Sequence, residues 1–111
     1  MQFKEYQEST ARTAVYNGRQ SVGGLVYSTL GLSGEAGEIA NKVKKIIRDA
    51  DGVLTNEVRA TLIDECGDVF WYLSQLCTEL GADLEDVAVA NIAKLTSRLE
   101  RGVIKGSGDN R

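Results

Sequence analysis

The chain of 111 residues carries 13 Lys and Arg against 16 Asp and Glu, a net charge of -3, and 42% of its residues are hydrophobic. These values are typical of one globular domain and exclude a disordered chain. No apolar run approaches the roughly 18 residues that cross a bilayer, and the first residues lack the apolar core of a signal peptide. Nucleic acid polymers usually need excess Lys and Arg. We therefore expect a cytoplasmic protein that binds neither a membrane nor a nucleic acid polymer.

The absence of histidine narrows the chemistry. It excludes Ser-His-Asp and Cys-His hydrolysis and almost every catalytic zinc site, so acid-base work falls to carboxylates. Cys66 and Cys77 lie about 16 Å apart along one expected helix, which is too far for them to pair with each other. Two free, buried thiols would suit a reducing compartment.

The absence of proline and the three-and-four spacing of apolar residues predict an all-α fold. We expect helices over about residues 3–16, 22–49, 55–80 and 83–102. The two long ones should lie antiparallel, with the two shorter helices packed across them, in a four-helix bundle. One domain should cover residues 1–105, followed by a flexible tail over residues 106–111. So small a chain buries limited apolar area, so a homo-oligomer is expected to cover the remaining helix faces.

Three glycines recur every three residues along the second expected helix, at Gly31, Gly34 and Gly37. Each costs a helix roughly 1 kcal/mol relative to alanine. This spacing predicts that a neighbouring backbone or a ligand approaches the helix closely along this side.

Two short acidic strings hold the predicted chemistry, Glu35 with Glu38 on the second helix and Glu65 with Asp68 on the third. Side chains three residues apart project from one side of a helix. If the antiparallel helices bring the strings face to face, four carboxylates converge, and they cannot all stay ionised without counter-charge. A hard divalent cation resolves this conflict, because Mg²⁺ binds carboxylate, water and phosphate oxygens. Mn²⁺ is the alternative ion.

The simpler interpretation is a solvated helix face, where pairs of acids three residues apart are common. However, Glu65 and Asp68 lie between two runs of large apolar residues, and acids beside a core need partners. Lys42 follows Glu35 by seven residues, and Tyr72 follows Glu65 by the same number. The fourth helix repeats the offsets zero, three, seven and ten with a set of one amide and three cations, Asn91, Lys94, Arg98 and Arg101. Cations of this set would hold the outer phosphates of an anionic ligand, whereas the alternative is a surface pair of Glu38 with Lys42 and a solvated cationic stripe.

The two acidic strings, separated by 26 residues, resemble the signature of the MazG-like nucleotide pyrophosphohydrolases, within the all-α NTP pyrophosphatase superfamily. The segments 32–38, 64–72 and 91–95 are also similar to that family, and the resemblance covers about residues 20–102. It implies a helical bundle that forms a homodimer or homotetramer. It also implies Mg²⁺-dependent hydrolysis of ribo- or deoxynucleoside triphosphates to monophosphate and pyrophosphate, in house-cleaning of the nucleotide pool.

The resemblance also implies roles for single residues. The metal ligands would be Glu35, Glu38, Glu65 and Asp68. Asn91 and Lys94 would contact water or phosphates, and Tyr72 would line the nucleotide site. Lys42 and Arg98 are the further candidates for binding phosphates. We expect Glu38 to be the general base.

Two other functions fit the same pattern. A phosphoribosyl-ATP pyrophosphohydrolase would share the metal site and differ in the pocket for the base. A non-catalytic helical oligomerisation module would use its acids only to bind Mg²⁺ or to keep its surface solvated.

Overall fold

The computed structural model describes all residues 1–111 and contains four helices and no strand. They are α1 (Phe3–Thr13), α2 (Val22–Asp49), α3 (Asn56–Glu79) and α4 (Leu84–Glu100). The all-α prediction is therefore confirmed. The first helix ends three residues earlier than predicted, because Tyr16 lies in a loop that bonds to α3 instead. None of the helices is both long and apolar enough to span a membrane.

The helix starts show which local signals could be read from the sequence. The Ser21 hydroxyl caps α2 by accepting a hydrogen bond from the Gly23 N–H, and Thr55 caps α3 in the same way. Asp83 precedes α4 as predicted, but its side chain makes no capping bond. Instead, the Leu84 N–H donates to the side-chain oxygen of Gln7 in α1, at 2.8 Å. A side chain distant in sequence thus satisfies a donor that a local cap normally takes.

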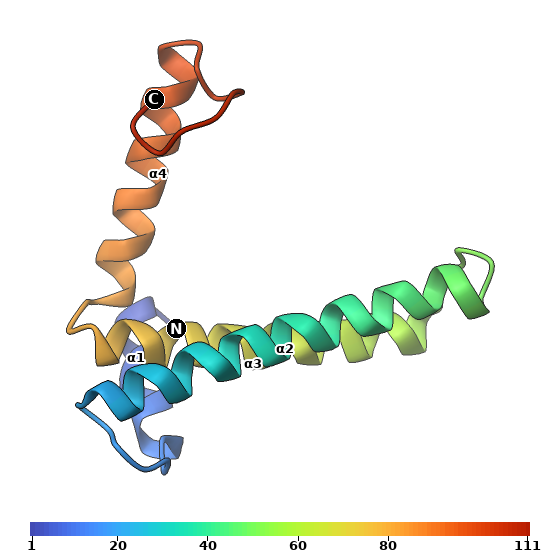
Figure 1. The fold of residues 1–111 in the computed structure, drawn as a ribbon, viewed down its shortest axis with the longest axis horizontal. Helices are drawn as coiled ribbons and strands as arrows, with labels where there is room; N and C mark the ends of the chain where they lie inside the picture. The colour runs from blue at the N-terminus through green and yellow to red at the C-terminus, as the bar shows by residue number, and fades with distance from the viewer.

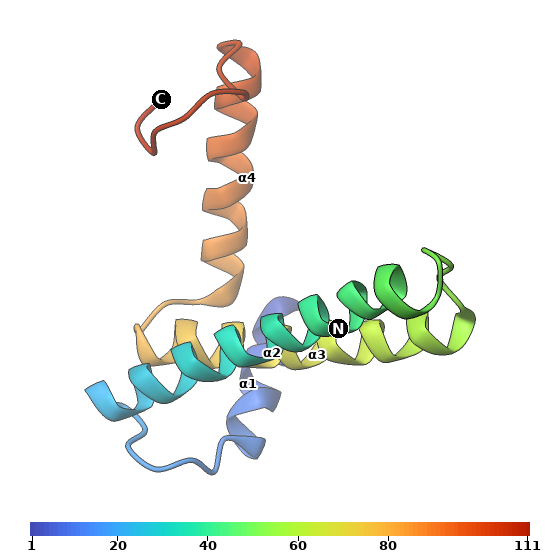
Figure 2. The ribbon, with the colours of Figure 1, turned by 45° about the vertical axis from the view of Figure 1, so that its right-hand side comes forward.

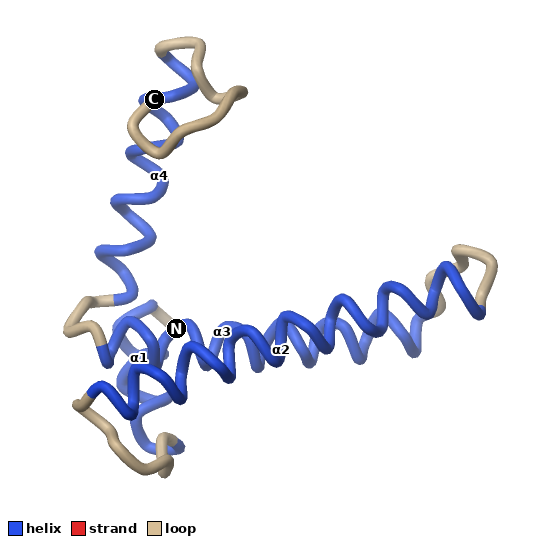
Figure 3. The backbone as a smooth tube through the Cα atoms, viewed as in Figure 1, coloured by secondary structure: helices blue, strands red, loops and turns tan.

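The helices α2 and α3 lie side by side along most of their lengths and are joined by the short connection 50–55 (Figures 1 and 3). They form a helical hairpin and run in opposite directions. We call the end with residues 50–55 the tip, and the opposite end, where α1 packs on α3, the base. Cys66 and Cys77 on α3 are both free, as predicted, but Cys66 is exposed.

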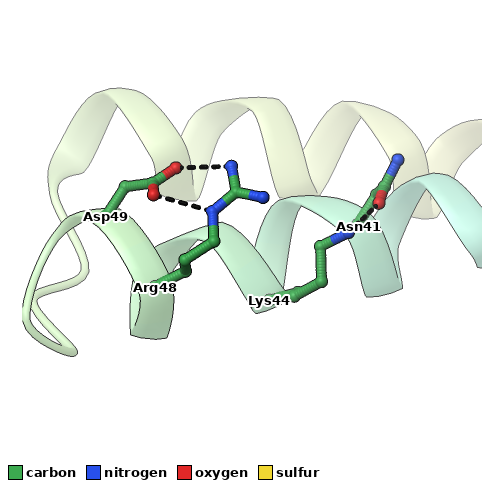
Figure 4. A network of polar contacts seen from close by, with 4 residues as sticks. All are labelled: Asn41, Lys44, Arg48 and Asp49. Atoms are coloured by element: carbon green, nitrogen blue, oxygen red, sulfur yellow. Dashed lines mark hydrogen bonds and ion pairs between the residues drawn. The ribbon is translucent and has the colours of Figure 1, made fainter.

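Toward the tip of the hairpin, the polar contacts on α2 are exposed (Figure 4). The Arg48 guanidinium donates two hydrogen bonds to the neighbouring Asp49 carboxylate, at 2.7 and 2.8 Å. One turn earlier, the Lys44 ammonium donates to the Asn41 side-chain oxygen at 2.8 Å. All four side chains are in solvent, so the tip has no buried polar contact of this kind.

The helix α4 projects away from the hairpin, as Figures 1 and 2 show. It contacts α1 and α3 but not α2. The single chain therefore does not close into the expected four-helix bundle, and its radius of gyration is 17.0 Å, whereas a compact domain of this length would have about 13 Å. The physical reason is that the chain offers the apolar face of α4 no internal partner. Ile92 and Leu99 are 64% and 66% exposed.

The best-buried region is the base of the hairpin, and its buried side chains are mainly polar. Ser28, Ser74 and Gln75 are fully buried, and Thr10 of α1 is nearly so. The Gln75 amide donates to the Thr10 hydroxyl at 2.8 Å, and the hydroxyls of Thr10 and Ser74 lie 3.0 Å apart. Buried polar groups must be hydrogen-bonded, so this network fixes how α1 crosses α3.

Candidate active site

Three of the four predicted acids meet between α2 and α3. Carboxylate oxygens of Glu35, Glu65 and Asp68 all lie within 4.8 Å of one another. Glu35 projects from α2, whereas Glu65 and Asp68 lie one turn apart on the facing side of α3. The antiparallel run of two helices thus brings together acids that are 30 or more residues apart in sequence. We call these three residues the acid cluster.

The acid cluster has an excess of negative charge. The pKa of Glu35 lies above its ordinary value because of desolvation first, then a hydrogen bond with Glu65, then the negative charges of Asp68, Glu65 and Glu38. One cation opposes these charges at close range, since the Lys42 ammonium lies 3.2 Å from a Glu65 carboxylate oxygen. A single lysine against three carboxylates leaves the cluster open to a further cation.

Glu38 is not one of the three clustered acids. It lies one turn after Glu35 on α2, and its side chain is exposed. Its charge still contributes to the raised pKa of Glu35. Its predicted roles as metal ligand and general base remain predictions.

A cavity of about 380 Å³ adjoins the acid cluster. Glu35 and Asp68 form its acidic side, and Tyr27, Trp71 and Tyr72 form an aromatic side, with Thr13 completing the wall. Ligand pockets commonly combine apolar walls with a few convergent polar groups, and this cavity has both.

The position of Tyr72 depends on Gly31. A methyl group placed on Gly31 would overlap the Tyr72 ring, so the group that approaches this glycine closely is a side chain and not the backbone or ligand that was predicted. Positions 34 and 37 have open space where a methyl group would stand, and nothing approaches them within this chain. The pKa of Tyr72 is raised by a hydrogen bond with Tyr27 first, then by desolvation and by the charges of Tyr27, Glu35 and Asp68. Tyr72 thus interacts both with Tyr27 of the aromatic side and with two acids of the cluster.

The predicted residues of α4 lie away from the acid cluster within one chain. Asn91 and Lys94 are exposed on a helix that does not touch α2. Arg98 is only 7% exposed, and its guanidinium donates to the Asp109 carbonyl at 2.7 Å. The tail, whose flexibility was expected, folds back on the end of α4, where Arg111 donates to the Val103 carbonyl at 3.1 Å.

Three residues of the cavity, Thr13, Tyr27 and Trp71, are not among the predicted site residues. Tyr27 lies four residues before Gly31 and eight before Glu35, so all three share one side of α2. This spacing is the signal that could have found Tyr27. No sequence signal points to Thr13, because its place depends on how α1 crosses α3.

The fold and cavity define an all-helical protein with a carboxylate cluster beside an aromatic pocket. The MazG nucleotide pyrophosphohydrolase domain matches residues 27–103, so the chain belongs to this family. The chain is also similar to the Gene 37 protein of Mycobacterium phage L5. The two are 56% identical over 109 residues, which cover 96% of each chain. No solved structure matches the chain significantly.

Proposed function

We propose that the protein is a Mg²⁺-dependent nucleoside triphosphate pyrophosphohydrolase that cleaves ribo- or deoxynucleoside triphosphates to the monophosphate and pyrophosphate. The observation that carries this proposal is the meeting of Glu35, Glu65 and Asp68 beside a cavity with an aromatic wall. Membership of the family supports the same class of reaction. House-cleaning of the nucleotide pool is the role that we propose for it.

The residues of the acid cluster fit a hard divalent ion. They offer only carboxylate oxygens, which suit Mg²⁺, or Mn²⁺ in its place. Desolvation first, then a hydrogen bond with Glu65 and the charges of the neighbouring acids, raise the pKa of Glu35. When bound, Mg²⁺ would neutralise phosphate charge and lower the pKa of water. Glu35, Glu65 and Asp68 would hold the ion, with Glu38 as a fourth carboxylate at the exposed edge.

The reaction then needs a proton acceptor for the attacking water and a positive charge that neutralises the leaving pyrophosphate. Water attacks the α-phosphorus, the bond from this phosphorus to the bridging oxygen breaks, and pyrophosphate leaves in line with the attacking oxygen. The proton of the water passes to Glu38, whose exposed carboxylate can return it to solvent. Lys42, now paired with Glu65, would turn its ammonium to the outer phosphates.

The α4 residues can take part only if a second chain is present. The exposed apolar side chains of α4 support a homodimer or homotetramer, in which Asn91 and Lys94 of one subunit would reach the acid cluster of another. Arg98 would join them after exchanging the Asp109 carbonyl for a phosphate. Ile92→Asp together with Leu99→Asp should convert the oligomer to a monomer in analytical ultracentrifugation, because each charge would enter an apolar contact. A wild-type chain that sediments as a monomer would contradict this assembly.

The test of the function is pyrophosphate release with and without Mg²⁺, over a panel of ribo- and deoxynucleoside triphosphates and phosphoribosyl-ATP. Asp68→Asn and Glu35→Gln should lower the rate at least about 100-fold, since a metal-held phosphate contributes several kcal/mol to the reaction. Glu38→Gln should lower it by about 10² to 10⁴ through loss of the base. The matched control is Asp64→Asn, an exposed acid of α3 outside the acid cluster, which should stay active.

Four outcomes would decide against this function or refine it. Orthophosphate as the first product would contradict the proposed bond cleavage. Full activity of a folded Asp68→Asn variant would remove the acid cluster from the mechanism. Cleavage of phosphoribosyl-ATP alone would favour the related pyrophosphohydrolase, and no cleavage of any substrate would favour a non-catalytic oligomerisation module.

A further inference from the structure

The aromatic wall of the cavity is a connected set of rings. The Trp71 ring meets the Tyr72 ring edge-on, with centroids 5.0 Å apart and an interplanar angle of 83°. The Tyr27 and Tyr72 rings are 6.1 Å apart. Outside the cavity, Tyr16 stacks on Tyr27 with centroids 4.5 Å apart and an angle of 18°. Such contacts add to the stability of each ring's orientation.

Thr13, at the end of α1, fixes the Trp71 indole. The indole N–H donates to the Thr13 hydroxyl oxygen at 2.8 Å, and this hydroxyl donates in turn to the Thr10 carbonyl at 3.1 Å. The hydroxyl therefore has one donor and one acceptor partner, and its position is set by α1. An indole has a single polar group, so this bond decides which face of Trp71 lines the cavity.

Tyr16 is fixed by Glu79 at the end of α3. Its hydroxyl donates to one Glu79 carboxylate oxygen at 2.5 Å, while the Gln20 N–H donates to the other at 2.9 Å. The carboxylate lies against Gly24, where a methyl group would come within 2.6 Å of it. The loop between α1 and α2 is thus clamped at both carboxylate oxygens, and Tyr16 cannot leave Tyr27 without breaking a charged hydrogen bond.

We propose that Thr13 and Tyr16 are positioning residues for nucleoside recognition. They hold Trp71 and Tyr27 as a stacking surface for the nucleobase, while the acid cluster takes the triphosphate end. Both lie before residue 27, where the match to the family begins, so that match assigns them no role. The inference rests on the proposed function, since it places a nucleotide in the same cavity.

The chemistry of the wall defines what it would recognise. Every nucleobase has two flat faces that stack on an aromatic ring, so the wall would separate nucleoside triphosphates from bare polyphosphates. The Trp71 N–H is taken by Thr13, and the hydroxyls of Tyr27 and Tyr72 bond to each other, so the rings offer a base their faces first. The ligand class is therefore nucleoside triphosphates in general.

Calorimetric titration of the full chain with two probes in Mg²⁺ tests this inference. One probe is an α,β-methylene nucleoside triphosphate, which cannot be cleaved at the proposed bond, and the other is inorganic tripolyphosphate, which has no base. Tyr16→Leu and Thr13→Val should weaken binding of the nucleoside probe about fivefold or more, in proportion to lost stacking. Binding of tripolyphosphate should not change. In the cleavage assay, Thr13→Val should raise KM and leave kcat unchanged.

Two further variants provide an intermediate case and a control. Tyr16→Phe keeps the ring but loses the bond to Glu79, and its effect should fall between wild type and Tyr16→Leu. Thr29→Val is the matched control, because Thr29 is exposed on α2 and bonds only to the Leu25 carbonyl of its own helix. Circular dichroism shows whether each variant folds.

The outcomes separate this inference from the proposed function. Equal weakening of both probes, or unchanged binding of the nucleoside probe in a folded Tyr16→Phe or Thr13→Val variant, would overturn the positioning role. Discrimination between the two probes without any pyrophosphate release would contradict the proposed function and support the positioning role. Pyrophosphate release without discrimination between the probes would support the proposed function and contradict the positioning role.

Discussion

The base and the tip of the α2–α3 hairpin use similar residue types to different effect. At the base, α1 covers the hairpin, and Gln75 and Ser74 are fully buried in hydrogen bonds to α1 and its loop. At the tip no third element is present, and the side chains of Arg48 and Asp49 are 59% and 55% exposed. Polar contacts hold a geometry where a third helix removes water, whereas in solvent they hold little. The acid cluster and its cavity lie toward the covered side.

The contrast between base and tip predicts that substitution of Gln75 lowers stability more than any other change considered below. Gln75→Leu removes the donor to Thr10 at 2.8 Å and one of two acceptors of the Tyr16 hydroxyl, at 3.2 Å, so the buried network loses two hydrogen bonds. The free energy of unfolding should fall by about 2 to 3 kcal/mol in urea denaturation. Asn41→Leu is the matched control near the tip, where an exposed amide accepts from Lys44, and it should change stability by less than about 0.5 kcal/mol. Equal losses in both variants would remove the distinction between base and tip.

Two glycines of α2 test how far the tight packing of the base extends toward the acids. Gly31→Ala should destabilise the protein by about 1 to 3 kcal/mol in thermal unfolding, because the methyl group would displace the Tyr72 ring. Gly34→Ala should stabilise it by about 0.5 to 1 kcal/mol, since that position faces open space and alanine is the better helix former. Stabilisation by both substitutions would mean that Tyr72 moves aside freely.

Sequence alone could predict the hairpin and the acid cluster because both follow from periodicity. Acids three residues apart must share a helix side, and an antiparallel partner must bring Glu35 near Asp68. Apolar spacing in the same way located α2, α3 and α4 to within a few residues. The glycine spacing predicted the close approach of a backbone or a ligand, but of the three glycines only Gly31 is approached, and by the Tyr72 ring, because the contact depends on where Tyr72 projects from α3.

The rest depends on contacts between elements, which periodicity does not encode. It shows that a helix has an apolar face but does not name the surface that covers it, so it could not show that α4 leaves the hairpin. The docking of α1 depends on Thr10, Ser74 and Gln75, whose residue types are typical of exposed positions. Thr13 was missed for the same reason.

A smaller effect is expected at alkaline pH, again at the base. Burial, a hydrogen bond to Glu79 and the charge of Glu79, in that order, raise the pKa of Tyr16 to about 12. The ordinary pKa of tyrosine is about 10, so folding favours the neutral phenol. This contribution to stability is complete below pH about 10 and is lost as the pH rises through about 12. Thermal unfolding should show a steeper alkaline decline for wild type than for Tyr16→Phe, and ultraviolet absorbance of tyrosinate should show the late titration. Parallel declines would mean that Tyr16 is not held by Glu79.

The smallest effect is expected at the tip, for Arg48→Ala. The Arg48 guanidinium lowers the pKa of Asp49, first of all through a hydrogen bond. The pair therefore contributes to stability at pH values above the ordinary pKa of a carboxyl group, and this contribution is lost as the pH falls through the pKa of Asp49 in the folded state. Both groups are in solvent, where water and salt screen the interaction, so the thermal midpoint should hardly move and any change should vanish at high salt. A lower midpoint that persists at high salt would show that something covers the tip in solution. Since nothing in one chain does so, the cover would have to be another subunit, and the exposed tip would be a property of the isolated chain only.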